Sequence, residues 1–249
     1  VIAGSSKVSS GYWRAMVYEN GVMSQLPKFA GTESWASSIN SNGQIVGGCN
    51  VSGGSPWHAC LWENNTIIDL GTLAGTSKSS ATGINDNGQI VGQSNNYPSL
   101  PRFGFIYEGG IMSGIGSLGQ SPADTRPRSI NNQGQIVGYS HTSDGHKHAF
   151  LCEGGVMTDL GVLGGNMSEA YGINDSGLIV GWAETVEGKT HAVLWIPVTL
   201  VGLEIRGPNE VAEAFSAQYK AIAHYDNGGT ADVTDSADWS VDDETIASI

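Results

Sequence analysis

The side chains best suited to chemistry in this sequence of 249 residues lie close together at 141–148. The stretch reads His-Thr-Ser-Asp-Gly-His-Lys-His, so two imidazoles, His141 and His146, flank the carboxylate of Asp144. These groups would bind a divalent metal if the stretch folded back on itself. No metalloprotease spacing accompanies them, and His148 belongs to a repeated pattern. A solvated loop is the simpler interpretation, and we expect neither a metal nor another cofactor.

Covalent catalysis has less support in the sequence. It contains no GxSxG elbow and no catalytic-cysteine context. Its Asn-Asp-Asn-Gly runs lack the later acidic ligand of a calcium loop, and tight-turn geometry accounts for them. A Ser-His-Asp triad built from distant parts of the chain stays open, because triads are spatial rather than sequential. If the protein is an enzyme, we expect its catalytic groups among His141, His146, Asp144, Arg126 and Arg128.

A second set of candidates consists of aromatic rings that the repeated pattern described next does not require, with polar groups beside them. A flat exposed ring stacks well on a sugar face, and Asp or Arg supplies directional hydrogen bonds. The other interpretation is that these rings pack between neighbouring sheets. The candidate ligand-binding residues are Trp35, Trp57, Tyr97, Asp124, Arg126, Arg128, Tyr139 and Trp182.

The elements that position these residues come from a repeat that fills the first four fifths of the chain. Its strongest line reads SINSNGQIVGG at 38–48, GINDNGQIVGQ at 83–93, SINNQGQIVGY at 129–139 and GINDSGLIVGW at 172–182. A second, aromatic-bearing line follows each of these, for example KHAFLCEGGVM at 147–157. The glycines that mark the repeat, at intervals of 43 to 46 residues, are Gly4, Gly47, Gly92, Gly138 and Gly181.

Each round of the repeat holds four short runs rich in β-branched and aromatic residues, which we call strands A (as in SATGIN), B (QIVG), C (HAFL) and D (VMTDLG). Asn-Gly and Gly-Gly pairs between A and B and between C and D are typical of tight hairpins. The sequence therefore predicts an all-β fold, a β-propeller of four-stranded antiparallel blades. About five blades are present. The first is incomplete because the chain opens at a B strand, and residues 198–206 are a possible fifth D strand.

These lines closely resemble the HAF-repeat family of extracellular bacterial proteins, named for the His-Ala-Phe that stands here at 148–150. The resemblance covers residues 1–197, although Arg14 and Phe103 replace the histidine in two rounds. The strand order is also similar to that of kelch propellers. The resemblance implies an extracellular or cell-surface location.

A second domain is predicted at 198–249, where the repeat stops. This segment resembles a bacterial Ig-like domain of group 2 through the strand-like runs LVGLEI, AQYKAIAHY and ADWSV and through Trp239. It is shorter than an Ig-like domain usually is, and so we expect a partial Ig-like β-sandwich.

The composition excludes two classes of partner. The net charge is −13, no basic cluster occurs, and residues 200–249 alone carry ten acidic and two basic side chains. Such a surface repels phosphate, so we expect no nucleic acid partner. No apolar run is long enough for a membrane span, and we expect no membrane insertion.

The three cysteines cannot all pair within one molecule. Cys49 and Cys60 flank one loop, and whether they form a disulfide is open from the sequence. Cys152 replaces an aromatic residue of its sister repeats, which predicts a buried thiol.

The repeat also assigns structural roles. Tyr18, Trp62, Tyr107 and Trp195 recur in register on the C strands, and we expect them in the core. The recurrence of His58, His148 and His191 predicts a hydrogen-bonding role between strands. Asp69 and Asp159 are expected to cap turns.

The position of a functional site follows from the antiparallel order of the four strands in each blade. The A–B and C–D turns must lie at one end of every blade, and the longer, variable B–C and D–A connections at the other. Variable loops on a rigid scaffold are the usual place for a binding site. The segments concerned are 5–12, 49–56, 94–101, 140–147 and 183–190 for B–C, and 27–35, 71–80, 116–126 and 161–169 for D–A.

We expect an extracellular binding, adhesion or structural module that recognises a glycan or a protein through these loops. The alternative is a propeller-fold enzyme, a polysaccharide lyase or hydrolase, with its site on the same loop face; the sequence favours binding over catalysis. A further possibility is self-association, in which the uncovered edge of the first blade accepts a strand from a neighbour.

Overall fold

A computed structural model describes residues 1–52, 56–96, 101–119, 124–197, 200–206, 220–225 and 229–232. The chain divides into two compact units, Val1–Ile196 and Pro197–Ile249. Throughout the described ranges the regular elements are β-strands, and none of these residues forms a helix with the length and apolarity to cross a membrane.

The first unit contains the strands that the repeat predicts. The A strands are β4 (Ser34–Ile39), β8 (Lys78–Ile84), β12 (Thr125–Ile130) and β16 (Gly164–Ile173). The B strands are β1 (Ile2–Lys7), β5 (Ile45–Asn50), β9 (Ile90–Asn95), β13 (Ile136–His141) and β17 (Ile179–Thr185). The C strands are β2 (Trp13–Glu19), β6 (Trp57–Glu63), β10 (Phe103–Glu108), β14 (Lys147–Glu153) and β18 (Thr190–Trp195). The D strands are β3 (Val22–Gln25), β7 (Thr66–Asp69), β11 (Ile111–Gly114) and β15 (Val156–Asp159).

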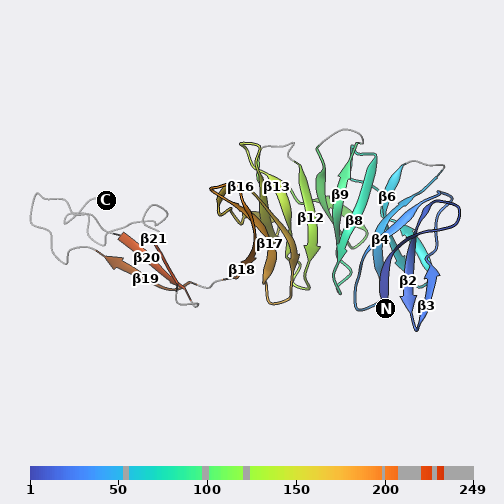
Figure 1. Ribbon diagram of the computed structural model, residues 1–249, viewed down its shortest axis with the longest axis horizontal. Coiled ribbons are helices and arrows are strands. Elements are labelled where there is room, and N and C mark those ends of the chain that lie inside the picture. Colours follow the sequence, from blue (N-terminus) through green and yellow to red (C-terminus); the bar gives the residue numbers. More distant parts are fainter. Residues whose placement is uncertain are drawn as a thin grey trace, which may run out of the picture. The chain divides into compact units, whose positions relative to one another are not determined.

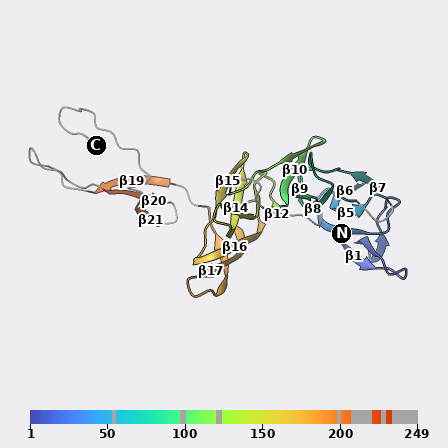
Figure 2. The ribbon, with the colours of Figure 1, turned by 90° about the horizontal axis from the view of Figure 1, so that it is seen from above.

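These strands form five antiparallel sheets, which we number as blades 1 to 5 in chain order. Blades 2, 3 and 4 have four strands each in the order A-B-C-D. The sheets stand side by side, and seen from above they fan out in an arc (Figures 1 and 2). The predicted all-β fold of propeller blades is confirmed, and so is the missing A strand of blade 1, which is the sheet β1-β2-β3.

One expectation about strands is wrong. Blade 5 is the three-stranded sheet β16-β17-β18, and residues 198–206 do not complete it. Their strand, β19 (Leu200–Arg206), pairs instead with β20 (Lys220–Tyr225), which pairs with β21 (Thr230–Asp232) to give the sheet of the second unit. Trp239 lies outside the described residues, and the Ig-like sandwich stays a prediction.

Two neighbouring positions of the repeat are buried inside the arc, and each is open at one of its two ends. Val46, Val91 and Val137 on the B strands are 0% exposed, because the next blade covers them, whereas the equivalent Val180 of blade 5 is 51% exposed. At the other end Ile2 is 65% exposed, while its four equivalents are between 1% and 3% exposed. Packing of one blade on the next therefore forms the core of this unit.

The glycine that marks the repeat is explained by a bulge in each A strand. In blade 4 the register shifts between Pro127 and Ser129, so Arg128 is an extra residue opposite β13. A Cβ at Gly138 would overlap the carbonyl oxygen of Arg126, so only glycine fits there. Gly4 of blade 1, where no A strand is present, has open space around it.

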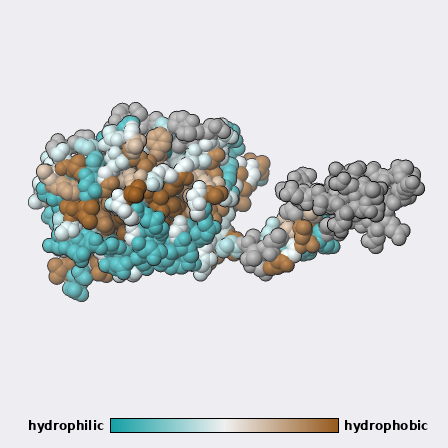
Figure 3. Space-filling view, turned by 180° about the vertical axis from the view of Figure 1, so that it is seen from behind, coloured by the Kyte–Doolittle hydropathy of each residue, from teal (hydrophilic) through white to brown (hydrophobic). Residues whose placement is uncertain are grey.

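The A–B turns of neighbouring blades are joined by a ladder of hydrogen bonds. Asn85 Oδ1 accepts the backbone N–H four residues on (2.9 Å), and its Nδ2 donates to the carbonyl oxygen of Asn131 in blade 4 (2.9 Å). Asn40 and Asn131 make the same bonds toward blades 3 and 5. Asn174 of blade 5 is exposed, and no described residue accepts a hydrogen bond from its side-chain Nδ2. Figure 3 shows a hydrophilic band along the lower edge of this unit.

Two of the three cysteines form a disulfide, and the third is a free thiol. Cys49 on β5 and Cys60 on β6 are bridged, which answers the question that the sequence leaves open. Cys152 is free and buried, as predicted, and burial raises the pKa of its thiol.

Candidate functional site

The candidate site lies at the long-connection end of blades 4 and 5, on one side of the blade 4 sheet. Arg126 on β12 pairs in register with Tyr139 on β13. Lys147 on β14 pairs with His141, two residues beyond Tyr139. Because side chains alternate along a strand, these four side chains project from the same side of the sheet.

Three cations surround the ring of Tyr139. The guanidinium carbons of Arg126 and Arg128 lie 5.3 and 5.7 Å from the ring centroid, and Lys147 Nζ lies 4.7 Å from it. These are cation–π distances. Tyr139 is only 7% exposed, and desolvation raises the pKa of its hydroxyl, which therefore stays protonated at neutral pH. The expectation of a flat exposed ring is wrong for Tyr139, because the cations cover it.

Glu169, on the A strand of blade 5, holds two of these cations. Its Oε1 accepts hydrogen bonds from Arg128 (Nε at 2.8 Å, Nη2 at 2.7 Å), and its Oε2 accepts one from Lys147 Nζ (2.9 Å). The Glu169 side chain is 5% exposed. Burial of a carboxylate is tolerated only when cations and hydrogen bonds compensate it, so this pairing fixes both cations across the seam between the blades.

Asp124 plays the same part on the other side of the site. Its Oδ2 lies 3.1 Å from Arg126 Nη2 and 3.7 Å from Arg102 Nη1, and its Oδ1 accepts the backbone N–H of Arg102 (2.9 Å). The site thus gathers four cations around two buried carboxylates. In a chain with 11 Lys and Arg against 24 Asp and Glu, this is a local excess of positive charge.

Three of these groups, Arg102, Lys147 and Glu169, were missed by reasoning from the sequence. Aligning the repeats of the sequence with one another would have pointed to these three residues. The A-strand position that holds Arg126 holds Glu169 in blade 5, and the residue before the HAF motif is Lys147 in blade 4 and Arg102 in blade 3. Charged side chains that differ between equivalent positions of neighbouring blades therefore come together at the long-connection end of those blades.

The three residues that the sequence offered as a possible metal site, His141, Asp144 and His146, are not grouped as metal ligands. His141 stands beside the site, with its ring centroid 6.3 Å from that of Tyr139. Asp144 accepts a hydrogen bond from the Thr142 hydroxyl, which holds the pKa of that carboxyl below its usual value, and His146 Nε2 is 3.8 Å from Asp144 Oδ2. Within the described ranges, no three His, Cys, Asp or Glu side chains are grouped so that they could hold a metal ion.

The remaining aromatic candidates divide between packing and the site. Trp35 and Trp57 pack against one another in blade 2, with centroids 4.4 Å apart. Trp182 lies at the site, where Lys147 Nζ is 4.7 Å from its ring and its Nε1 donates to the Tyr171 hydroxyl (3.1 Å). The prediction for Tyr97 falls outside the described residues.

Two of the repeat histidines and both aspartates have the roles that the pattern predicts. His58 Nδ1 is 2.8 Å from Asp69 Oδ1, and His148 Nδ1 is 2.7 Å from Asp159 Oδ2, so each pair joins strand C to strand D. Both aspartates also accept a backbone N–H two residues on, which caps the turn. His191 belongs to blade 5, which has no D strand.

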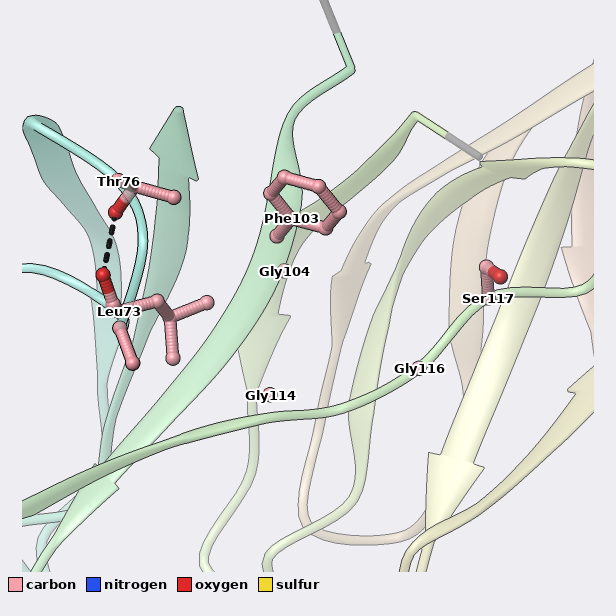
Figure 4. Close-up of a pocket in the computed structure, with 8 residues that line it drawn as sticks. Leu73, Thr76, Phe103, Gly104, Gly114, Gly116 and Ser117 are labelled. Carbon is pink, nitrogen blue, oxygen red and sulfur yellow. Dashed lines mark hydrogen bonds between the residues drawn. The ribbon is translucent and has the colours of Figure 1, made fainter. Parts of the chain in front are cut away.

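Blade 3 differs from its sisters at this pair and carries a pocket there (Figure 4). Its residues at the His and Asp positions are Phe103 and Gly114, and Gly104 replaces the alanine. The pocket has a volume of about 310 Å³. It is lined by Leu73, Ala74, Thr76, Phe103, Gly104, Gly114, Gly116 and Ser117.

Comparison with known proteins gives little beyond the fold. No family model matches the sequence, and no curated protein is significantly similar to it. One solved structure that matches is a gluconolactonase from Xanthomonas campestris, at 11% identity over 86% of this chain and 78% of that chain, with a TM-score of 0.38. At this TM-score the match assigns no activity to the chain. The resemblances to HAF-repeat and Ig-like proteins stay predictions.

The expectation of a binding, adhesion or structural module is nevertheless corrected. The protein matched is an enzyme, as in the alternative interpretation, a propeller-fold enzyme. Which chemistry the site supports has to be decided from its side chains.

Proposed function

We propose that the propeller unit is an enzyme that cleaves an acidic polysaccharide by β-elimination, with its active site at the cationic cluster of blades 4 and 5. The observation that carries this proposal is the arrangement of Arg102, Arg126, Arg128 and Lys147 around only two carboxylates. Two positive charges remain in excess, and a uronic acid residue brings a carboxylate that guanidinium groups bind well.

The site favours a lyase over a hydrolase. A glycoside hydrolase usually needs a carboxylic acid that donates a proton and a second free carboxylate. Asp124 and Glu169 each bind two cations, so both carboxylates are occupied in positioning those cations. A lyase instead needs cations that neutralise the substrate carboxylate, a base and a proton donor.

The residues of the cluster fit these roles. Arg126 and Arg128 neutralise the uronate carboxylate, which makes the proton on C5 more acidic. An imidazole accepts protons near neutral pH, and His141 stands beside the cluster to accept this one. As the bond from C4 to the bridging oxygen breaks, the leaving oxygen takes a proton from the imidazolium formed on His141 or from solvent. The products are a reducing end and a sugar with a C4=C5 double bond.

An extracellular place of action is part of the proposal. Disulfides persist in oxidising compartments, and the bridge between Cys49 and Cys60 supports such a location. Polymeric acidic polysaccharides are found in the same surroundings.

The test is turnover of a panel of polyuronates, followed by the ultraviolet absorbance of the C4=C5 product. We expect His141→Ala and Arg128→Ala to lose about 100-fold or more in rate. His146→Ala on the same hairpin is the matched control and should keep full activity. A folded protein that forms no unsaturated product from any polyuronate would falsify the proposal.

A further inference from the structure

The pocket of blade 3 lies where its sister blades carry a paired His and Asp. In blades 2 and 4 the corresponding positions hold a hydrogen-bonded His and Asp, His58–Asp69 and His148–Asp159. In blade 3, Phe103 cannot pair with an Asp, and Gly114 has no side chain. A Cβ built at Gly114 meets nothing nearer than the Gly104 carbonyl oxygen at 3.9 Å, so the space is free.

The walls of this pocket are those of a site for one sugar ring. Phe103 presents an aromatic ring, and Leu73 adds an aliphatic side (Figure 4). The hydroxyls of Thr76 and Ser117 also belong to the lining, where they donate to the carbonyl oxygens of Leu73 (2.8 Å) and Gly119 (2.9 Å) and leave their own oxygens as acceptors. A pyranose ring offers an apolar C–H face and a polar rim of hydroxyls, and this combination matches an aromatic wall with polar groups at the margin.

The size of the pocket agrees with a single ring. Its volume of about 310 Å³ is at the small end of ligand pockets, which run from roughly 300 to 1,000 Å³. No cationic side chain lines it. A neutral sugar therefore fits it better than a uronate.

The backbone connects the pocket directly to the cationic cluster. Phe103 directly follows Arg102, which bonds to Asp124 of the cluster through its backbone N–H and lies 3.7 Å from it with its guanidinium. The far wall at Ser117 leads to Gly119, where a Cβ would overlap the backbone of Thr142, the neighbour of His141. The two sites thus lie at the same end of the blades, although successive residues of an extended strand point to opposite faces and so Phe103 and Arg102 do not share one.

We infer that this pocket is a subsite that holds one neutral sugar ring of the polysaccharide, stacked on Phe103, at the same end of the blades as the cationic cluster that holds the uronate. The inference rests on the proposed function and adds to it the class of substrate: a heteropolysaccharide in which neutral sugars accompany uronic acids. Phe103 and Gly114 would then determine substrate specificity without taking part in bond cleavage.

The sister blades supply the test variants. Gly114→Asp places in the pocket the carboxylate that blades 2 and 4 carry, and Phe103→His with Gly114→Asp rebuilds the whole pair, which the fold accepts twice already. Ser113→Asp is the matched control, since its side chain projects from the opposite face of the strand. The probes are neutral disaccharides and tetrasaccharides of glucose, xylose and mannose for calorimetric binding, and uronate oligosaccharides with and without neutral units for KM and kcat.

We expect both pocket variants to weaken binding of one neutral series, and to raise KM for the mixed oligosaccharides, by about tenfold or more, with kcat and the pure uronates unaffected. Unchanged binding and KM in folded pocket variants would overturn the subsite and leave the lyase in place. Neutral-sugar binding that Gly114→Asp abolishes, in a protein without any turnover, would support the subsite and refute the lyase. A wild-type protein that binds no probe and turns over no uronate overturns both.

Discussion

Glu169 on blade 5 and Lys147 on blade 4 are joined across the seam between the blades by a hydrogen bond of 2.9 Å from Lys147 Nζ to Glu169 Oε2. The other oxygen of the same carboxylate binds Arg128. One buried acid therefore fixes two cations that belong to the neighbouring sheet. The orientation of the cations in the site depends on the docking of two blades, and loss of this acid should be visible in both stability and activity.

Replacing Glu169 by Gln removes the charge and leaves Arg128 and Lys147 close together without a counterion. We expect the free energy of unfolding to fall by about 1–3 kcal/mol, less than for a fully buried pair because both cations are partly exposed to solvent. Urea unfolding measures this. Glu187→Gln, in an exposed turn of the same blade, should change stability by less than about 0.5 kcal/mol. Equal effects of the two variants would show that Glu169 holds nothing in place.

Two valines at one repeat position allow a test of blade packing. Val137→Ala removes two methyl groups from a side chain that is fully covered by blade 5, and we expect a loss of about 2 kcal/mol. Val180→Ala makes the same change on the open face of blade 5, where the loss should stay below about 0.5 kcal/mol. Thermal or urea unfolding of both variants gives the comparison. A large loss for Val180 would mean that something covers this face in solution.

The fold could be predicted from the sequence because the blades repeat. Strand order and turn positions follow from periodic apolar residues and from Asn-Gly and Gly-Gly pairs, and β4 to β18 lie where these signals put them. The role of the marker glycine could not be predicted. Gly138 is required by the bulge at Arg128, and a bulge leaves no separate signal in the strand pattern. The pairing of residues 200–206 depends on contacts with a distant strand, which periodicity does not report.

About half of the candidate site could be predicted. Arg126, Arg128, Tyr139 and Trp182 were found as residues that depart from the repeat, and they do come together. Their interpretation as exposed ligand contacts was wrong for Tyr139, since the sequence does not show that three cations converge on its ring. Glu169 was missed because it acts on the neighbouring blade, and the seam between blades cannot be read from one round alone.

The ladder of asparagine turns predicts a difference between two equivalent residues. Asn85→Ala removes two bonds to Gln89, one from its backbone N–H and one to its side-chain oxygen, and the bond to the carbonyl of Asn131 in blade 4, and we expect a loss of about 2–3 kcal/mol. Asn174→Ala removes only turn bonds among the described residues, so its loss should be about 1 kcal/mol. Urea unfolding of the two variants measures the bond between blades together with the bond to Gln89 Oε1, which Leu178 cannot provide in blade 5. If both lose the same amount, the ladder contributes nothing beyond turn formation.

The thiols give a prediction that combines redox state with pH. Without reductant, the unfolded chain should show one thiol per molecule to a thiol reagent, namely Cys152, and three after reduction of the bridge between Cys49 and Cys60. In the folded protein the reaction should be slow, because burial raises the pKa of Cys152 above its ordinary 9.0 and disfavours the thiolate. The folded state therefore binds this proton more tightly than the unfolded state does. Its contribution to stability is complete below pH 9.0 and falls as the pH rises through the folded pKa, an alkaline loss that Cys152→Ala should lack. Fast labelling of the native protein at neutral pH, or two reactive thiols before reduction, would contradict this assignment of the three cysteines.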